Sequence, residues 1–296
     1  MKVSRTGEAM SNALEFAVEI QVYTNAKREV LKRLNFILGF VDDQKPSVIT
    51  KYVINLQNQY QKLVQENLIK KLGISLDELI DEFDYLQRNP ELAQLSLNFF
   101  LHNLHLPEKI EWSKEKINVI NKDYLHSFLL PRYYNLVALI ETIGREEAIK
   151  LYKKYITCFQ KERRKNHESD FVDLETLLEN RIRPGDKPSE WVIFHALLNE
   201  GKYAYRNNNC TWVDALEELP DSELKYLVCC YGDYEGAKLR DESLILTMEH
   251  TIAQGDPYCS RVLHDTRVDY DLRHPPKEFW DNFEPGKEEI ALKYYK

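Results

Sequence analysis

Apolar side chains recur every three or four positions through most of the first hundred residues. This spacing runs through residues 11–40 and returns in 53–68 and 92–106, and it is typical of amphipathic helices. Three glycines occur in these hundred residues, so few positions have the backbone freedom that interrupts a helix. We therefore expect residues 1–115 to form a helical region.

A charged segment of weak periodicity covers residues 107–121, and we interpret it as a linker. The helical pattern resumes at residue 124, breaks at Gly144 and ends in a basic run at residues 161–165. Cations in a last helical turn are favoured by the helix dipole, so this run is interpreted as a solvated helix end. An anion-binding patch is the alternative interpretation.

The pattern changes after Pro184-Gly185, where alternating apolar residues and more frequent glycines are typical of strands. We expect strands at residues 224–231, 244–252 and 258–265, and one more helix at residues 190–204. Residues 116–296 would then form an α+β domain. The predicted fold class is α+β and predominantly helical, with an N-terminal helical region followed by helices packed on a short antiparallel sheet.

The charge balance argues against nucleic acid and against an anionic membrane surface as partners. The chain has 40 Lys+Arg and 48 Asp+Glu, a formal net charge of −8, and lacks the basic footprint that phosphate binding requires. Its apolar runs fall far short of the roughly 20 residues that cross a bilayer, and the first residues lack the apolar core of a secretory signal. We expect a cytoplasmic protein with a small-molecule partner, and a homodimer is left open.

The common cofactor and metal motifs are missing from the sequence. It contains no phosphate-binding glycine loop, HExxH motif or GxSxG elbow, so we expect no cofactor. Five cysteines without a CxxC pair indicate free thiols. A zinc site from His250, Cys259, His264 and Asp265 would have a spacing that matches no established pattern, so we expect no metal.

Polar and reactive side chains cluster in the last third of the chain, which holds Cys229, Cys230 and Cys259. If residues 224–231 form a strand, Cys229 and Cys230 point to opposite faces, and at most one of them enters a site.

His250 and Cys259 flank a Gly255-Asp256-Pro257 turn. Paired strands joined by this turn would bring the imidazole within reach of the thiol, which can then be activated as a thiolate. The alternative is a hydrogen-bonded core histidine and a small buried cysteine.

Two segments carry a resemblance to a known family. Residues 227–234 (Leu-Val-Cys-Cys-Tyr-Gly-Asp-Tyr) and 249–259 (Glu-His-Thr-Ile-Ala-Gln-Gly-Asp-Pro-Tyr-Cys) resemble the C-terminal signature of the L-2-amino-thiazoline-4-carboxylic acid hydrolase family. Residues 143–148 are similar to a Leu-Gly-x-Glu-x-Ala helix of the same family. The resemblance extends over about residues 125–275. The layout is also similar to a vinyl-reductase-type ligand-binding fold.

The resemblance implies hydrolytic opening of a cyclic isothiourea or of a related C–N or C–S bond in an amino-acid-like substrate. It suggests Cys259 as nucleophile, His250 as its base, Asp233 as a water-binding or amidine-binding carboxylate and Arg267 as a carboxylate clamp. Further substrate-binding candidates are Cys229, Cys230, Glu249 and Thr251. The alternative is a non-catalytic small-molecule-binding or biosynthetic accessory protein that uses the same pocket.

Overall fold

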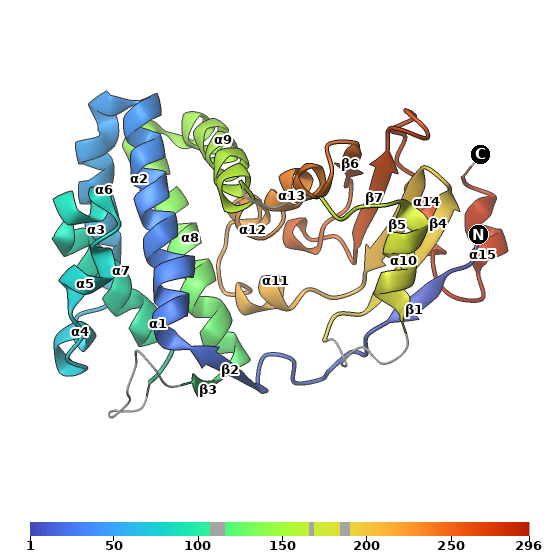
Figure 1. The fold of residues 1–296 in the computed structure, drawn as a ribbon. Coiled ribbons are helices and arrows are strands. Elements are labelled where there is room, and N and C mark those ends of the chain that lie inside the picture. The colour runs from blue at the N-terminus through green and yellow to red at the C-terminus, as the bar shows by residue number, and fades with distance from the viewer. Residues whose placement is uncertain (107–115, 166–168, 184–189, 296) are drawn as a thin grey trace. The chain divides into compact units, whose positions relative to one another are not determined.

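The computed structural model describes residues 1–106, 116–165, 169–183 and 190–295. The chain divides into two compact units. The helical unit is Leu14–Phe159, and the sheet unit combines Met1–Ala13 with Gln160–Lys296. The predicted fold class, a predominantly helical α+β protein with an antiparallel sheet, is confirmed (Figure 1).

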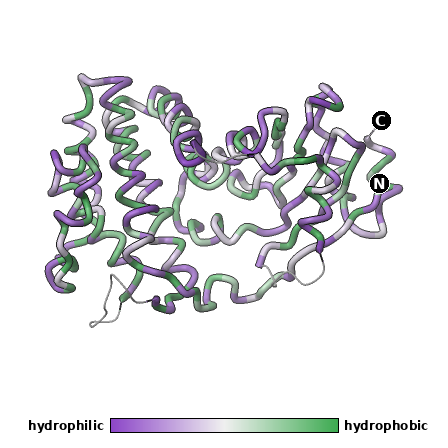
Figure 2. The backbone as a smooth tube through the Cα atoms, viewed as in Figure 1, coloured by the Kyte–Doolittle hydropathy of each residue, from purple (hydrophilic) through white to green (hydrophobic). Residues whose placement is uncertain are grey.

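The helical unit consists of helices and one two-stranded ladder. Its elements are β2 (Ala17–Gln21), α1 (Val22–Asn25), the π-helical η1 (Ala26–Leu31), α2 (Lys32–Gln44), the short η2 (Pro46–Val48), α3 (Ile49–Leu63), α4 (Leu68–Lys71), α5 (Leu76–Ile80), α6 (Asp84–Arg88), α7 (Pro90–Asn103), β3 (Lys116–Ile120), α8 (Asn121–Ile143) and α9 (Arg145–Arg163), whose last residues count with the sheet unit. Figure 2 shows hydrophobic and hydrophilic residues alternating along these helices, as the sequence pattern predicts.

Helices α3, α7 and α8 pack together in the core of the helical unit. Leu56, Leu97 and Leu136 are fully buried there. The Tyr60 hydroxyl donates to Asn135 Oδ1 at 3.1 Å, which satisfies a polar group within this apolar core. No helix in the described ranges is both long and apolar enough to span a bilayer.

The sheet unit is built on five antiparallel strands in the order β1-β4-β5-β7-β6. Its elements are β1 (Ser4–Thr6), α10 (Leu174–Ile182), β4 (Ile193–Asn199), β5 (Lys202–Asn207), α11 (Thr211–Ala215), α12 (Ser222–Cys229), α13 (Gly232–Arg240), β6 (Leu244–Thr247), the 3-10 turn η3 (Ile252–Gln254), β7 (Cys259–Asp265), α14 (Lys277–Asp281) and α15 (Glu288–Leu292).

Alternate residues of β7 face opposite sides of this sheet. Val262 packs with Phe279 and Trp280 of α14 on one side. Leu263 packs with Leu174 of α10 and with apolar residues of α13 on the other. This second side carries the candidate site, because α12 and α13 bring additional polar side chains to it.

The helix expected over residues 190–204 is wrong, because β4 and β5 form a hairpin there. The apolar segment of residues 191–198, which His195 interrupts, is too short to separate a helical from a strand period. Gly201 lies in the connecting turn, where an added Cβ would come within 3.0 Å of the Asp269 Cβ. Residues 200 and 201 therefore turn the chain where the expected helix would have continued.

The strand expected over residues 224–231 is also wrong, because residues 222–229 form α12. The Asp221 carboxylate accepts a hydrogen bond from the Leu224 N–H at 3.2 Å, which is the N-cap geometry of a helix. The strand prediction relied on the alternation of apolar residues and did not take into account Asp221 as an N-cap residue.

Other predicted elements are confirmed in part. The strand expected at 258–265 is β7. The strand expected at 244–252 ends at Thr247, although the Ser260 N–H still donates to the His250 carbonyl at 3.0 Å. Within the helix expected over residues 11–40, Ala17–Gln21 form β2, which pairs with β3.

The predicted linker at 107–121 includes β3, and its residues 107–115 lie outside the described part of the chain. The predicted boundary between residues 115 and 116 stays a prediction.

Candidate functional site

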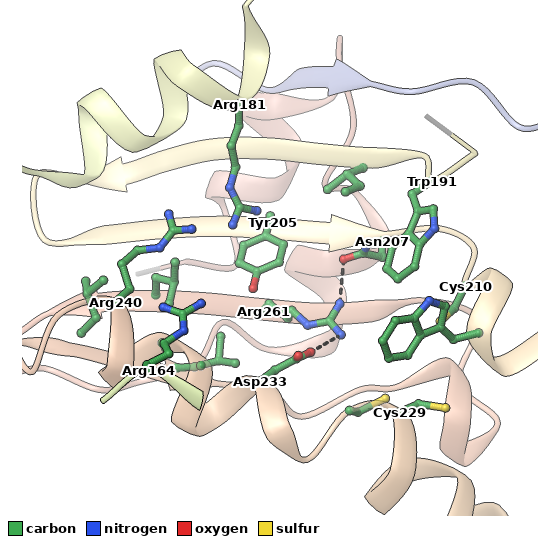
Figure 3. Close-up of a pocket in the computed structure, with 18 residues that line it drawn as sticks. Arg164, Arg181, Trp191, Tyr205, Asn207, Cys210, Cys229, Asp233, Arg240 and Arg261 are labelled. Carbon is green, nitrogen blue, oxygen red and sulfur yellow. Dashed lines mark hydrogen bonds and ion pairs between the residues drawn. The ribbon is translucent and has the colours of Figure 1, made fainter. Parts of the chain in front are cut away.

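A cavity of about 330 Å³ lies on the side of the sheet that α10 and α13 cover (Figure 3). Tyr205 of β5 and Arg261 and Leu263 of β7 form its floor, and α12 and α13 contribute to its wall. All of its lining residues belong to the sheet unit. The volume lies in the range of pockets that hold small molecules.

One end of the cavity is basic. Figure 3 shows Arg164, Arg181 and Arg240 directed toward one another on one side of Tyr205. The Arg181 guanidinium lies over Tyr205, with its Cζ 5.2 Å from the ring centroid. Burial lowers the pKa of Arg240, the like charges of Arg181 and Arg164 lower it further, and the carboxylate of Asp170 opposes this shift.

The middle of the cavity contains an ion pair. Arg261 Nη2 donates to Asp233 Oδ2 at 3.0 Å and Nη1 donates to Asn207 Oδ1 at 2.7 Å (Figure 3). Partial desolvation raises the pKa of Asp233, and the positive charge of Arg261 opposes that rise. The negative charge of Asp233 in turn raises the pKa of Arg261 despite burial. Asp233 thus combines access to the cavity with a pKa above the ordinary value of an aspartate.

The opposite end of the cavity holds thiols and indoles. Cys210, Cys229 and Cys230 line it together with Trp191 and Trp212. Burial raises the pKa of the Cys210 thiol to about 12 and that of the Cys230 thiol well above its ordinary value. Cys229 is half-buried and is the most accessible of these three thiols. A planar or soft group of a ligand would find apolar and polarizable contacts at this end.

A buried hydrogen-bond chain anchors the strands beside the basic end. His195 Nδ1 lies 2.6 Å from the Tyr203 hydroxyl, and His195 Nε2 lies 2.6 Å from the Thr6 hydroxyl. Burial lowers the pKa of His195 to about 4, so the imidazole is neutral at neutral pH. Arg181 Cζ lies 5.7 Å from the Tyr203 ring centroid, so this chain holds the aromatic surface on which Arg181 rests.

Three of the predicted site residues meet in this cavity: Asp233, Cys229 and Cys230. The expectation that at most one of the two adjacent cysteines enters a site rested on a strand that the structure does not contain, and both cysteines line this cavity. Cys229 is the last residue of α12 and Cys230 follows at its C-cap, so the alternation of a strand does not apply to them.

Cys259 and His250 lie outside the lining of the cavity. The buried Cys259 Sγ accepts a hydrogen bond from the Ile252 N–H at 3.3 Å, and burial raises the pKa of this thiol. The His250 ring packs edge to face against Tyr258, and its Nδ1 lies 3.9 Å from Asp256 Oδ1. His250 Nε2 is buried and finds no hydrogen-bond partner in the described ranges. The roles of Cys259 and His250 stay predictions.

The remaining predicted residues also lie elsewhere. Arg267 donates to both carboxylate oxygens of Asp265, with Nη2 2.6 Å from Oδ2, and to the Val172 carbonyl. Thr251 is buried and donates to Gln254 Oε1 at 2.9 Å, and Glu249 does not line the cavity. Their substrate-binding roles stay predictions.

Sequence reasoning missed Arg181, Arg240, Tyr205 and the two indoles. Arg164 lies in the basic run at 161–165, for which an anion-binding patch was the alternative interpretation. The other residues come from separate elements that only the tertiary fold brings together. Among the described residues, no three His, Cys, Asp or Glu side chains are arranged to hold a metal ion.

Residues 127–262 match the family model of L-2-amino-thiazoline-4-carboxylic acid hydrolase. The match confirms the resemblance inferred from the sequence, and it includes every charged and thiol residue of the cavity named above. No curated protein and no solved structure gives a significant match to the chain.

Proposed function

We propose that the cavity is the active site of a hydrolase that opens a small cyclic isothiourea, or a related ring, bearing an anionic group. The observation that carries this proposal is the order of groups along one cavity: guanidinium groups, then the Asp233–Arg261 pair, then thiols and indoles. The family match to residues 127–262 supports a hydrolase, and the size of the cavity supports a small substrate.

The basic end would bind the substrate carboxylate. A guanidinium group can donate two parallel hydrogen bonds to a carboxylate, which fixes both the position and the orientation of the ligand. Arg181 is suited to this role because Tyr203 and Tyr205 support its planar group. Substrate held in this way would extend its ring toward Asp233 and the thiols.

The reaction consumes one water molecule. The water oxygen attacks the ring carbon between nitrogen and sulfur, and the bond from that carbon to sulfur breaks. The oxygen becomes the carbonyl of a carbamoyl group, while the two water protons end on the former ring nitrogen and on the leaving sulfur. The products are thus a carbamoyl group and a free thiol in one molecule.

Asp233 would accept the proton of the attacking water. General bases are most effective when their pKa approaches the working pH, and the raised pKa of Asp233 shifts it in that direction. The hydrogen bond from Arg261 leaves the second carboxylate oxygen, Oδ1, for the water or for the amidine nitrogen. Arg261 would therefore position the base.

In the alternative route a thiol attacks the ring carbon, the ring C–S bond breaks and the thiol proton passes to the leaving sulfur; water then attacks the enzyme-bound carbon, which releases the carbamoyl product and restores the thiol. Cys229 has the best access to the cavity for this role. The predicted nucleophile Cys259 would need the side chains beside it to move before substrate could reach its buried thiol. Raised pKa values at Cys210 and Cys230 disfavour thiolates at these two residues. Ligand binding without bond cleavage is the second candidate function.

The test is incubation of the full chain with 2-amino-thiazoline-4-carboxylate in ¹⁸O-labelled water, with the product followed by mass spectrometry. We expect a carbamoyl product that carries one ¹⁸O. Asp233→Asn should lower kcat at least 100-fold, and Asp77→Asn, an exposed carboxylate of the helical unit, should not. Saturable binding of the compound without product would refute the hydrolase and favour the binding protein.

A further inference from the structure

The three arginines at the basic end of the cavity form no salt bridge with a described carboxylate, although the charge of Asp170 acts on Arg240 from beyond salt-bridge distance. Three other cations of the sheet unit pair with carboxylates: Lys202 with Asp271 at 2.8 Å, Arg267 with Asp265 at 2.6 Å and Arg261 with Asp233 at 3.0 Å. In the described part of the chain, no carboxylate lies within ion-pair distance of Arg164, Arg181 or Arg240. The described lining holds four arginines and one aspartate, although the whole chain has a net charge of −8.

We propose that this end of the cavity binds a dianionic group, either a phosphate or a pair of carboxylates, on the molecule that the cavity accepts. This inference rests on the proposed function, because the dianionic group belongs to a substrate only if the cavity is an active site. It goes further than that function, which needs a single carboxylate. One carboxylate neutralises one guanidinium group, which leaves two positive charges facing each other in the cavity. A dianion can accept hydrogen bonds from two or three guanidinium groups at once.

The arrangement of the basic end favours a bound anion over the water that would otherwise fill this part of the cavity. Arg181 lies on the faces of Tyr203 and Tyr205, so its position is fixed before any ligand arrives. Burial destabilises the charge of Arg240 and lowers its pKa, and repulsion from Arg181 and Arg164 adds to this effect while Asp170 opposes it. Holding like charges together costs free energy in the empty cavity, and an anion would recover that cost on binding.

The test measures anion binding to the full chain by isothermal titration at constant ionic strength. The probes are inorganic phosphate, malonate and acetate, with chloride as the background anion. We expect phosphate or malonate to bind at least tenfold more tightly than acetate. Preference for phosphate would identify a phosphate-bearing ligand, and preference for malonate would identify a dicarboxylate. Equal binding of acetate, or no binding of either dianion, would overturn the inference.

Substitutions of single arginines test whether the dianion binds at the basic end of the cavity. Arg240→Gln and Arg181→Gln should each weaken dianion binding about tenfold, whereas Arg273→Gln, which removes an exposed guanidinium group outside the cavity, should not. Without an added anion, Arg240→Gln should unfold at the same temperature as the parent chain or at a higher one, because repulsion is relieved. Unchanged dianion binding in both cavity variants would overturn the inference even if both are folded.

Asp233→Asn separates this inference from the proposed function. This variant should keep dianion binding while it loses hydrolysis, because Asp233 faces the middle of the cavity. A parent chain that binds dianions but hydrolyses no cyclic isothiourea would refute the proposed function and support the dianion site. Hydrolysis by a parent chain that binds no dianion would refute the dianion site alone.

Discussion

The Tyr203 hydroxyl lies 2.6 Å from His195 Nδ1, with the two rings parallel at an interplanar angle of 1°. This contact joins β5 to β4 on the side of the sheet that carries the cavity. It also fixes the ring beneath Arg181, so a buried contact between two strands determines the position of a charged group in the candidate site.

Removing that hydroxyl should affect both stability and binding. We expect Tyr203→Phe to lower the free energy of unfolding by about 1–3 kcal/mol, because the buried His195 nitrogen loses its partner. Urea unfolding measures this change, and Tyr270→Phe, at an exposed tyrosine, is the matched control. Equal stability of the two variants would show that the contact contributes nothing.

Stability should fall as the pH is lowered from about 6.5 toward 4. Burial lowers the pKa of His195 and His264 to about 4 and that of His274 to about 3. An unfolded histidine has a pKa of about 6.5, so the unfolded chain binds more protons in this window and gains stability relative to the folded chain. The contribution of each histidine is complete above about pH 6.5 and is lost as the pH falls.

Unfolding in urea at several pH values measures this effect. We expect a loss of about 1–2 kcal/mol per buried histidine between pH 7 and pH 5. Replacing His264 with Gln should flatten the profile, and replacing the exposed His102 should leave it unchanged. A parent profile that is flat over this range would contradict the prediction.

The five cysteines should react with iodoacetamide in order of exposure. Cys158 is exposed and should label first, followed by Cys229, whereas Cys210, Cys230 and Cys259 should resist labelling in the folded chain. Peptide mass spectrometry after brief labelling at pH 7.5 gives the order. Fast labelling of Cys259 that slows in His250→Asn would instead support the predicted nucleophile and its base.

The helix that carries Cys229 should depend on its N-cap. Asp221→Ala should cost about 1 kcal/mol, because the Leu224 N–H loses its acceptor at the start of α12. Asp221→Asn preserves an acceptor and should recover most of that loss in thermal unfolding. Equal stability of the Ala and Asn variants would show that this cap does not hold the helix.

Long helices were predictable from the sequence in outline, whereas of the short segments strand β7 was predicted and α12 and the hairpin of β4 and β5 were not. Periodicity over many turns identified the helices of residues 11–106 in outline, whereas the eight residues of α12 fit a strand pattern as well as a helical one. The hairpin of β4 and β5 was missed for the same reason. Its apolar residues serve two cores, one on each side of the sheet, so they do not alternate clearly with polar ones.

The candidate site was predictable only where its residues are neighbours in sequence. Cys229, Cys230 and Asp233 lie within five positions and share a recognisable motif. Arg181 comes from α10 and Arg240 from α13, and each reads in isolation as a basic residue near the end of a helix. Their convergence on one cavity depends on how both helices pack against the sheet, which local patterns do not encode.

The division of the sheet unit along the chain has a consequence for the order of folding. Strand β1 precedes the helical unit, and the contact between Thr6 and His195 joins residues 189 positions apart. Chains are synthesised from the N-terminus at about 5–20 residues per second, so β1 leaves the ribosome many seconds before its partner strand exists. The helical unit can meanwhile fold from contacts of its own. Pairing of β1 with β4 is then a late event in synthesis. The Thr6–His195 contact forms only after β4 has been made and β1 joins it as an edge strand of the sheet.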